Sequence, residues 1–134
     1  MYLVDTSVWI DYFNEVDNRS TEKLEYIFNH DIEFGITAVI YQEILQGAAT
    51  TTDFAKLEAY LKTQCFYHPL NLLESYTEAA RLYFDCRRRG VTVRSTIDCL
   101  IARIAIEHNL ILLHNDRDFQ YIGQIIPELK QEST

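Results

Sequence analysis

The sequence has little glycine or proline, no paired cysteine motif and no long apolar run. Four glycines and two prolines among 134 residues, with a hydrophobic fraction of 48%, exclude collagen-like and disordered chains. The three cysteines, Cys65, Cys86 and Cys99, lack Cys-x-x-Cys spacing, so we interpret them as reduced core residues rather than as disulfides or zinc ligands. No apolar run reaches the roughly 18 to 20 residues that span a bilayer, and no basic leader precedes Asp5, so we expect a soluble, cytoplasmic protein.

Basic side chains are also scarce. Twelve Lys and Arg stand against 20 Asp and Glu, which gives a net charge of −8 and argues against a polyanionic partner such as nucleic acid. The charge is unevenly placed, however, because residues 81–103 contain six arginines and only two aspartates, a net charge of +4. The position of the charges therefore matters more than their sum, and part of the acidity is available for a metal site.

Short apolar segments alternate with amphipathic stretches along the chain. Residues 2–4, 34–36 and 110–113 have the pattern of strands, and the last is uninterrupted, as in a strand buried on both faces of a parallel sheet. Residues 65–67 are a further possible strand. Helices are expected over residues 8–13, from about residue 20, over 38–46, 52–64, 72–89 and 95–108, and as one turn near 119–122. This alternation predicts an α/β fold, a three-layer α/β/α domain with a mainly parallel central sheet. We expect a single domain over residues 1–129 and a flexible tail over 130–134.

Four carboxylates occupy positions where such a sheet gathers its ligands. Asp5 and Asp116 each follow an expected strand, so both lie at the carboxyl edge of the sheet. Glu43 and Asp98 come from helices, where each borders an apolar stripe. Carboxylates against a core face are costly to desolvate and repel one another unless a cation compensates them, and oxygen-only ligands suit Mg²⁺ or Mn²⁺ rather than zinc. Taken singly, the residues also have ordinary interpretations as an Asx cap, a solvated helix residue and a first-turn residue.

Four segments in this order and chain length resemble one known family. They are Asp5-Thr6-Ser7 after the first strand, YQEILQG around Glu43, TIDCLIA around Asp98, and LLHNDRDF with Asp116 and Asp118. Together they resemble the PIN-domain ribonucleases, and in particular the VapC-type toxins of type II toxin–antitoxin systems. No single motif is specific, whereas the four together are, and the resemblance covers essentially the whole chain.

The resemblance implies a metal-dependent endoribonuclease that holds one or two Mg²⁺ or Mn²⁺ ions through four carboxylates: Asp5, Glu43, Asp98 and Asp116. Bound metals would lower the pKa of a water molecule and neutralise charge on the phosphodiester. Asp118 is implied as an accessory acid, and a hydroxyl of Thr6 or Ser7 would orient Asp5. The implied partners are a VapB-like antitoxin, structured RNA such as transfer or ribosomal RNA, and a second copy of the chain in a homodimer. No membrane is implied.

Two features next to these segments have more than one interpretation. His114 stands where many family members carry Thr or Ser, and it is either a contact to substrate or metal or a tolerated variant. Arg87, Arg88 and Arg89 end a helix, where cations suit the helix dipole, and Arg94 precedes the helix that bears Asp98. These arginines either flank the metal site and bind RNA phosphates or form a solvated helix end.

Three other functions compete with a ribonuclease. A haloacid-dehalogenase-like enzyme, or another metal-dependent phosphohydrolase on a small substrate, also begins with an Asp after a strand. It needs a second Asp two residues later, where this chain has Ser7. A phospho-acceptor receiver domain needs an acidic pair after its first strand, and Asp5 stands alone. A catalytically silent PIN-like binding module would not need the intact set of acids.

Overall fold

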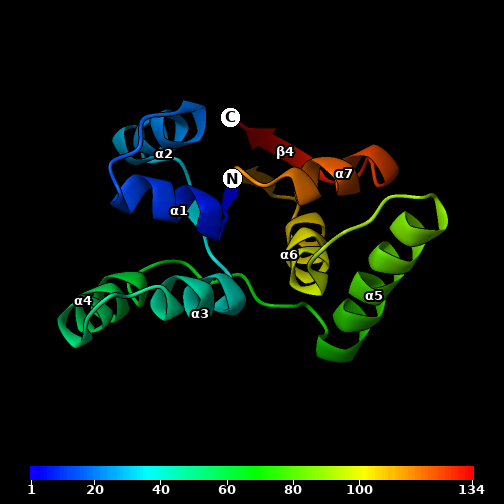
Figure 1. Ribbon diagram of the computed structural model, residues 1–134, viewed down its shortest axis with the longest axis horizontal. Helices are drawn as coiled ribbons and strands as arrows, with labels where there is room; N and C mark the ends of the chain where they lie inside the picture. The colour runs from blue at the N-terminus through cyan, green and yellow to red at the C-terminus, as the bar shows by residue number, and fades with distance from the viewer.

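A four-stranded, wholly parallel sheet forms the centre of the computed structural model, which describes residues 1–134 (Figure 1). The strand order is β2-β1-β3-β4, with β1 at Tyr2–Val4, β2 at Phe34–Gly35, β3 at Ile111–His114 and β4 at Lys130–Ser133. Helices lie on both sides of the sheet, which confirms the predicted α/β/α architecture. Because the strands are parallel, their carboxyl ends all meet at one edge of the sheet.

Seven helices connect the strands: α1 (Thr6–Phe13), α2 (Arg19–Asn29), α3 (Ala38–Gln46), α4 (Thr51–Leu61), α5 (Leu72–Arg88), α6 (Thr96–Glu107) and α7 (Arg117–Ile125). In Figure 1, α1 to α4 occupy one half of the molecule and α5 to α7 the other. None of these helices combines the length and the apolar composition that a membrane span requires.

Side-chain caps explain where most helices begin. Six of the seven residues that precede a helix accept a hydrogen bond from a first-turn N–H through their side chains: Asp5, Asn18, Thr37, Thr50, Asn71 and Asp116. Such caps satisfy N–H groups that have no partner inside the helix, and each contributes roughly 1 kcal/mol. Two of the caps, Asp5 and Asp116, are also predicted site residues, so the signal that starts a helix also holds a carboxylate in place.

The core surrounds the two central strands. Leu3 and Leu112 of β1 and β3 have no exposed surface, and neither do Trp9 of α1 and Phe119 of α7. Burying one large apolar side chain stabilises the fold by about 1.5–3 kcal/mol. The uninterrupted apolar run that predicts β3 therefore reflects real burial, and it anchors the strand ends from which the candidate site is built.

The structure corrects three expectations about less apolar segments. Residues 130–134 are not simply a flexible tail, because Lys130–Ser133 form β4 in register with β3. The polar sequence of β4 suits an edge strand held by backbone hydrogen bonds, and it has no apolar alternation to reveal it. The possible strand over 65–67 is reduced to one bridge between Ile36 and Phe66. Cys65 is exposed, so only two of the three cysteines belong to the core.

Candidate metal centre and active site

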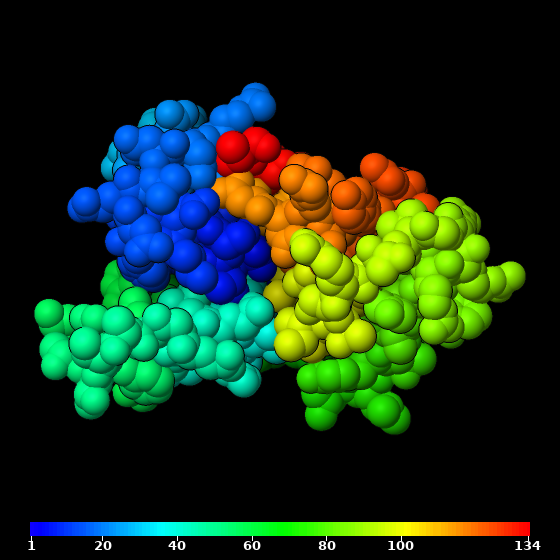
Figure 2. Space-filling view, viewed as in Figure 1, coloured from blue at the N-terminus to red at the C-terminus, as the bar shows by residue number.

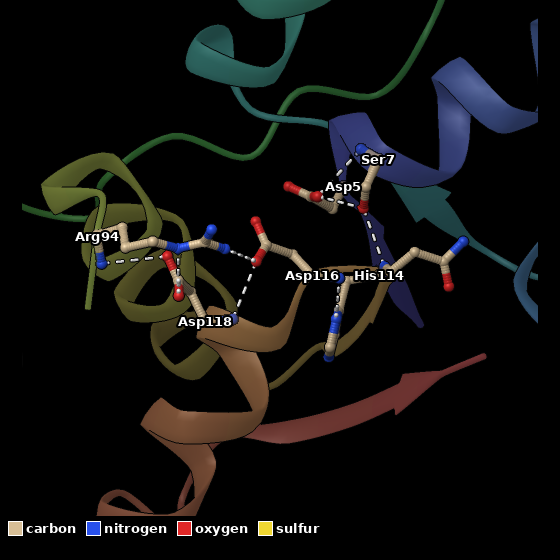
Figure 3. Close-up of polar contacts among 7 residues, drawn as sticks. Asp5, Ser7, Arg94, His114, Asp116 and Asp118 are labelled. Atoms are coloured by element: carbon tan, nitrogen blue, oxygen red, sulfur yellow. Dashed lines mark hydrogen bonds and ion pairs between the residues drawn. The ribbon is translucent and has the colours of Figure 1, made fainter. Parts of the chain in front are cut away.

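Asp5 and Asp116 lie beside each other at the carboxyl edge of the sheet. Asp5 directly follows β1, and Asp116 lies two residues after the end of β3. The last pairing of these strands joins Val4 to Leu113, and the backbone N–H of Asp5 donates to Leu113 O at 2.9 Å. Each aspartate caps the helix that follows it: Oδ2 of Asp5 accepts from Ser7 N at 3.1 Å, and Oδ1 of Asp116 accepts from Asp118 N at 2.9 Å (Figure 3). The strand-to-helix turns thus bring both carboxylates to one place.

Three aspartates form the tightest part of the cluster. One carboxylate oxygen from each of Asp98, Asp116 and Asp118 lies within 4.8 Å of the other two. Asp98 enters from the first turn of α6 and is 7% exposed, while Asp118 on α7 is 2% exposed. Glu43 of α3 is half-buried and adds to the repulsion felt by Asp98. Of the four predicted ligands, Asp98 and Asp116 thus lie in this cluster together with Asp118, whereas Asp5 and Glu43 lie outside it, near enough for their charges to raise the pKa of Asp98.

Burial and repulsion from neighbouring charges make Asp98, Asp5 and Glu43 hard to ionise. Burial, followed by the charges of Asp116 and Asp5, raises the pKa of Asp98 to about 8. Burial also raises the pKa of Asp5 and of Glu43, although hydrogen bonds from Ser7 and Thr6 partly offset this effect. A divalent cation would remove the repulsion by stabilising the charged forms. An oxygen-only donor set of this kind fits Mg²⁺ or Mn²⁺.

Two neighbouring hydroxyls hold two different carboxylates. Oγ of Ser7 donates to Asp5 Oδ2 at 2.6 Å and accepts from the backbone N–H of Asn115 at 2.9 Å (Figure 3). Oγ1 of Thr6 donates instead to Glu43 Oε1 at 2.8 Å. Of the two hydroxyls expected to orient Asp5, Ser7 is therefore the one that does so, and Thr6 connects α1 to α3. Asn115, which lines the site beside Ser7, is a residue that the sequence analysis missed.

Arg94 reaches into the acidic cluster. Its Nε lies 3.3 Å from Asp118 Oδ1 and its Nη2 3.7 Å from Asp116 Oδ1, while its backbone N–H donates to Asp118 Oδ2 at 3.2 Å. The side chain is 73% exposed, so we expect these ion pairs to contribute only about 0–1 kcal/mol of stability. Arg94, Asp116 and Asp118 line an open cleft of about 800 Å³, together with Ser7, Thr92, Asn115, Arg117 and Tyr121. Asp116 and Asp118 are the carboxylates that line this cleft, so solvent reaches the acidic cluster from their side.

The other three arginines of the predicted set stay outside the cluster. Arg87, Arg88 and Arg89 are exposed at the end of α5, where the guanidinium carbons of Arg87 and Arg88 lie 5.8 and 5.5 Å from the centre of the Phe84 ring. Figure 2 shows this end of the helix, in yellow-green, against α7, in orange. They form a basic surface joined to Arg94 by a short loop.

His114 does not face the carboxylates with a free nitrogen. Its ring is fully buried, and its Nε2 lies 2.7 Å from Gln131 Oε1 on β4. Its Nδ1 accepts from the backbone N–H of Asp116 at 3.1 Å (Figure 3). Burial lowers the pKa of His114, which favours a neutral ring. Both ring nitrogens are thus occupied, and neither is free to bind metal or substrate.

Comparison with known proteins agrees with this geometry. The family model described as "PIN domain" matches residues 2–125. Ribonuclease VapC11 of Mycobacterium tuberculosis and VapC ribonuclease Mb1587 of Mycobacterium bovis are each 32% identical to this chain over 126 residues, which cover 93% of both sequences. The fold is similar to that of VapBC2 from Rickettsia felis, solved with a DNA fragment from its promoter, with a TM-score of 0.74, 19% identity and coverage of 99% and 98% of the two chains. For VapBC-1 from nontypeable Haemophilus influenzae the TM-score is 0.73, with 17% identity and coverage of 98% and 96%. The aspartates at the strand ends, the sequence similarity over almost the whole chain and the shared fold all agree. The chain therefore belongs to the PIN-domain family of VapC ribonucleases.

Proposed function

We propose that this protein is the toxin of a toxin–antitoxin pair and that it cleaves structured RNA, either transfer or ribosomal RNA, as an Mg²⁺- or Mn²⁺-dependent endoribonuclease. The observation that carries the proposal is the convergence of Asp98, Asp116 and Asp118, with carboxylate oxygens within 4.8 Å of one another, at the carboxyl edge of a parallel sheet. The relatives named as ribonucleases support the reaction type. The intact set of acids leaves no observation that favours a silent binding module.

The chain's own residues fix the proposed metal ligands before any ion binds. Asp5, Glu43, Asp98 and Asp116 would hold the ions, with Asp118 beside them. Bound ions would activate water and stabilise the charge that develops on the scissile phosphate. Ser7 restrains one oxygen of Asp5, and Thr6 restrains one oxygen of Glu43, so the second oxygen of each is the one left for a cation. Such hydrogen bonds restrict ligand rotation and typically change metal affinity 10- to 100-fold.

Arg94 in the cleft and the exposed arginines that end α5 would position the RNA. Arg94 stands between the carboxylates and solvent with its guanidinium exposed, where a substrate phosphate would contact it. The exposed cluster of Arg87, Arg88 and Arg89 would bind phosphates farther along the same strand. The segment 81–103 carries a net charge of +4 in a chain that is otherwise acidic, so it is the part of the molecule that attracts a polyanion such as RNA.

The proposed protein partners are a VapB-like antitoxin and a second copy of the chain. Solved structures with the same fold are VapBC complexes, and the cluster of Asp98, Asp116 and Asp118 suits a basic antitoxin segment. Apolar side chains that begin α5 are strongly exposed, with Leu72 at 70%, Leu73 at 80% and Tyr76 at 51%. An exposed apolar surface of this kind supports a homodimer.

The experiment that tests the function compares RNA cleavage by the wild type with that of Asp5→Asn and Asp98→Asn. Each variant removes one carboxylate charge with little change of shape, so we expect Mn²⁺-dependent cleavage to fall at least about 100-fold and growth arrest on expression to be relieved. Asp17→Asn, which changes an exposed aspartate away from the cleft, is the matched control and should cleave like the wild type. Sequencing of RNA ends after brief expression identifies the substrate.

Circular dichroism would establish that all three variants are folded. Cleavage at the wild-type rate by both Asp5→Asn and Asp98→Asn would show that the assignment of the metal ligands is wrong. Cleavage by the wild type that persists after chelation of divalent ions would exclude the metal dependence.

A further inference from the structure

The buried ring of His114 connects the C-terminal strand to Asp116. A backbone N–H can only donate, so Nδ1 of His114, 3.1 Å from Asp116 N, must be the acceptor. The ring proton of a neutral histidine then lies on Nε2, which donates to Gln131 Oε1 at 2.7 Å. These two contacts fix both the tautomer and the orientation of the ring, which also packs against Phe119 at a centroid distance of 5.0 Å.

The amide of Gln131 is oriented by a third contact. Its Nε2 donates to the backbone carbonyl of Phe119 at 3.2 Å, and a carbonyl can only accept. The amide oxygen is therefore the atom turned toward His114. Three hydrogen bonds run in one consistent direction, from Asp116 N–H through the His114 ring and the Gln131 amide to the carbonyl of Phe119.

Gly123 gives the Gln131 amide its space. A Cβ atom added to Gly123 would lie 2.0 Å from Nε2 of Gln131 and 3.3 Å from its Cδ. Glycine inside a helix is about 1 kcal/mol less favourable than alanine, and Gly123 lies in the interior of α7. Glycine at position 123 is thus unfavourable for the helix, but it leaves the space that the Gln131 amide occupies.

The connection ends on a proposed metal ligand that is held from two sides. The backbone of Asp116 donates to His114, and its side chain accepts from Asp118 N at 2.9 Å. We propose that Gln131 and His114 are positioning residues for Asp116, and that Gly123 exists to admit the Gln131 amide. The inference rests on the proposed function, because it requires Asp116 to bind metal. It makes the C-terminal strand a part of the metal centre.

Mn²⁺ binding to the metal-free protein, followed by electron paramagnetic resonance of the free ion, tests the proposal without any need for RNA. We expect Gln131→Leu and His114→Gln to weaken Mn²⁺ binding about 10-fold, since each breaks the connection. His114→Asn keeps an oxygen at the place of Nδ1 that accepts from Asp116 N–H but loses the contact with Gln131, so its Mn²⁺ affinity should fall about as much as that of Gln131→Leu. Ser133→Ala is the matched control: it removes a side-chain hydrogen bond from Gln120 of α7 to β4 and leaves the backbone pairing of Ser133 with His114 in place, so Mn²⁺ affinity should not change.

Gly123→Ala tests the role of the Gln131 amide independently. In the wild-type background the new methyl group displaces the Gln131 amide, and we expect about the same 10-fold loss of Mn²⁺ affinity. In a Gln131→Ala background the same substitution meets no amide, so it should cause no further loss.

The tautomer of His114 is measured on the wild-type protein, which keeps the proposal falsifiable if a variant does not fold. A long-range ¹H–¹⁵N spectrum should show the proton on Nε2. A proton on Nδ1, or Mn²⁺ affinities of Gln131→Leu and His114→Gln within twofold of the wild type, would overturn the inference. Absence of Mn²⁺ binding by the wild type would overturn both this inference and the proposed function. Mn²⁺ binding without RNA cleavage would overturn the proposed function alone.

Discussion

At the residue scale, Asp98 shows that the acidic cluster lowers the stability of the metal-free protein once its carboxylates are charged. Its ordinary pKa is 3.8, and burial together with the charges of Asp116 and Asp5 raises the pKa to about 8 in the folded protein. Between these two values the folded state keeps a proton that the unfolded state has lost. Raising the pH through this window therefore lowers the stability of the metal-free protein, and the effect is complete once both states are ionised.

Asp98→Asn should stabilise the metal-free protein more at pH 8 than at pH 5, because it removes this titration. Thermal unfolding in the presence of a chelator should show the difference in melting temperature between variant and wild type widening by about 5 °C or more across that range. Mn²⁺ should raise the melting temperature of the wild type more at pH 8 than at pH 5. Asp17→Asn, at an exposed position, should follow the wild type at both values. A constant difference between Asp98→Asn and wild type would contradict the role assigned to Asp98.

Thr6 and Ser7 are adjacent in the sequence, but only the hydrogen bonds of Ser7 to Asp5 are local. Ser7 reaches Asp5 from two residues away, an Asx-type contact that the local sequence encodes. Thr6 reaches Glu43 from 37 residues away, which depends on how α3 packs against α1. The sequence could therefore predict a hydroxyl beside Asp5 but could not assign one hydroxyl to each carboxylate.

At the element scale, α5 ends in three consecutive exposed arginines. Its last turn carries Arg87 and Arg88, which favour the negative end of the helix dipole, and Arg89 follows as the C-cap. Local sequence predicts this helix end well, since positive φ at Gly90 ends the turn. The helix dipole accounts for their placement, and the salt dependence of RNA binding tests their proposed contact with phosphates.

Replacing Arg87, Arg88 and Arg89 together by Ala should weaken RNA binding. If each contacts one phosphate, the slope of log K against log salt should become shallower by about 2 to 3. Fluorescence anisotropy with a non-cleavable RNA over a range of salt concentrations measures this slope. Arg81→Ala is the control, because Arg81 lies on the same helix and pairs with Glu78 at 3.5 Å. An unchanged slope in the triple variant would leave these arginines as a solvated helix end.

At the scale of the whole molecule, β4 completes the sheet and reaches the site. It covers the edge of β3 and places Gln131 beside His114. Thr134 also contacts the chain, since its backbone N–H donates to Asn115 Oδ1 at 3.2 Å and its hydroxyl donates to Ser20 Oγ at 2.9 Å. The C-terminal residues thus stabilise both the sheet and the cleft.

Deletion of residues 130–134 should therefore lower the urea midpoint and reduce Mn²⁺ affinity at least about 10-fold. The deletion exposes the backbone of β3 as a new sheet edge, which also favours aggregation. Urea unfolding and Mn²⁺ titration of the truncated chain measure the two effects, and the full-length Ser133→Ala variant separates them from loss of a single side-chain contact. A truncated chain that matches the full-length protein in both measurements would show that these residues behave as a tail.

The sequence by itself determined the alternation of strands and helices, the cap at Asp5, and the acidic residues that resemble a PIN-domain site. These features depend on neighbours one to four residues apart, through periodicity and cap hydrogen bonds. Only the tertiary structure decided the partners of Thr6, Arg94, His114 and the polar strand Lys130–Ser133. Arg94 with Asp118, His114 with Gln131 and Thr6 with Glu43 join residues 17 to 37 positions apart. The strand Lys130–Ser133 is held by backbone pairing, which a side-chain pattern does not encode. Packing of the whole chain chooses among such contacts, because each is worth little until the surrounding core has formed.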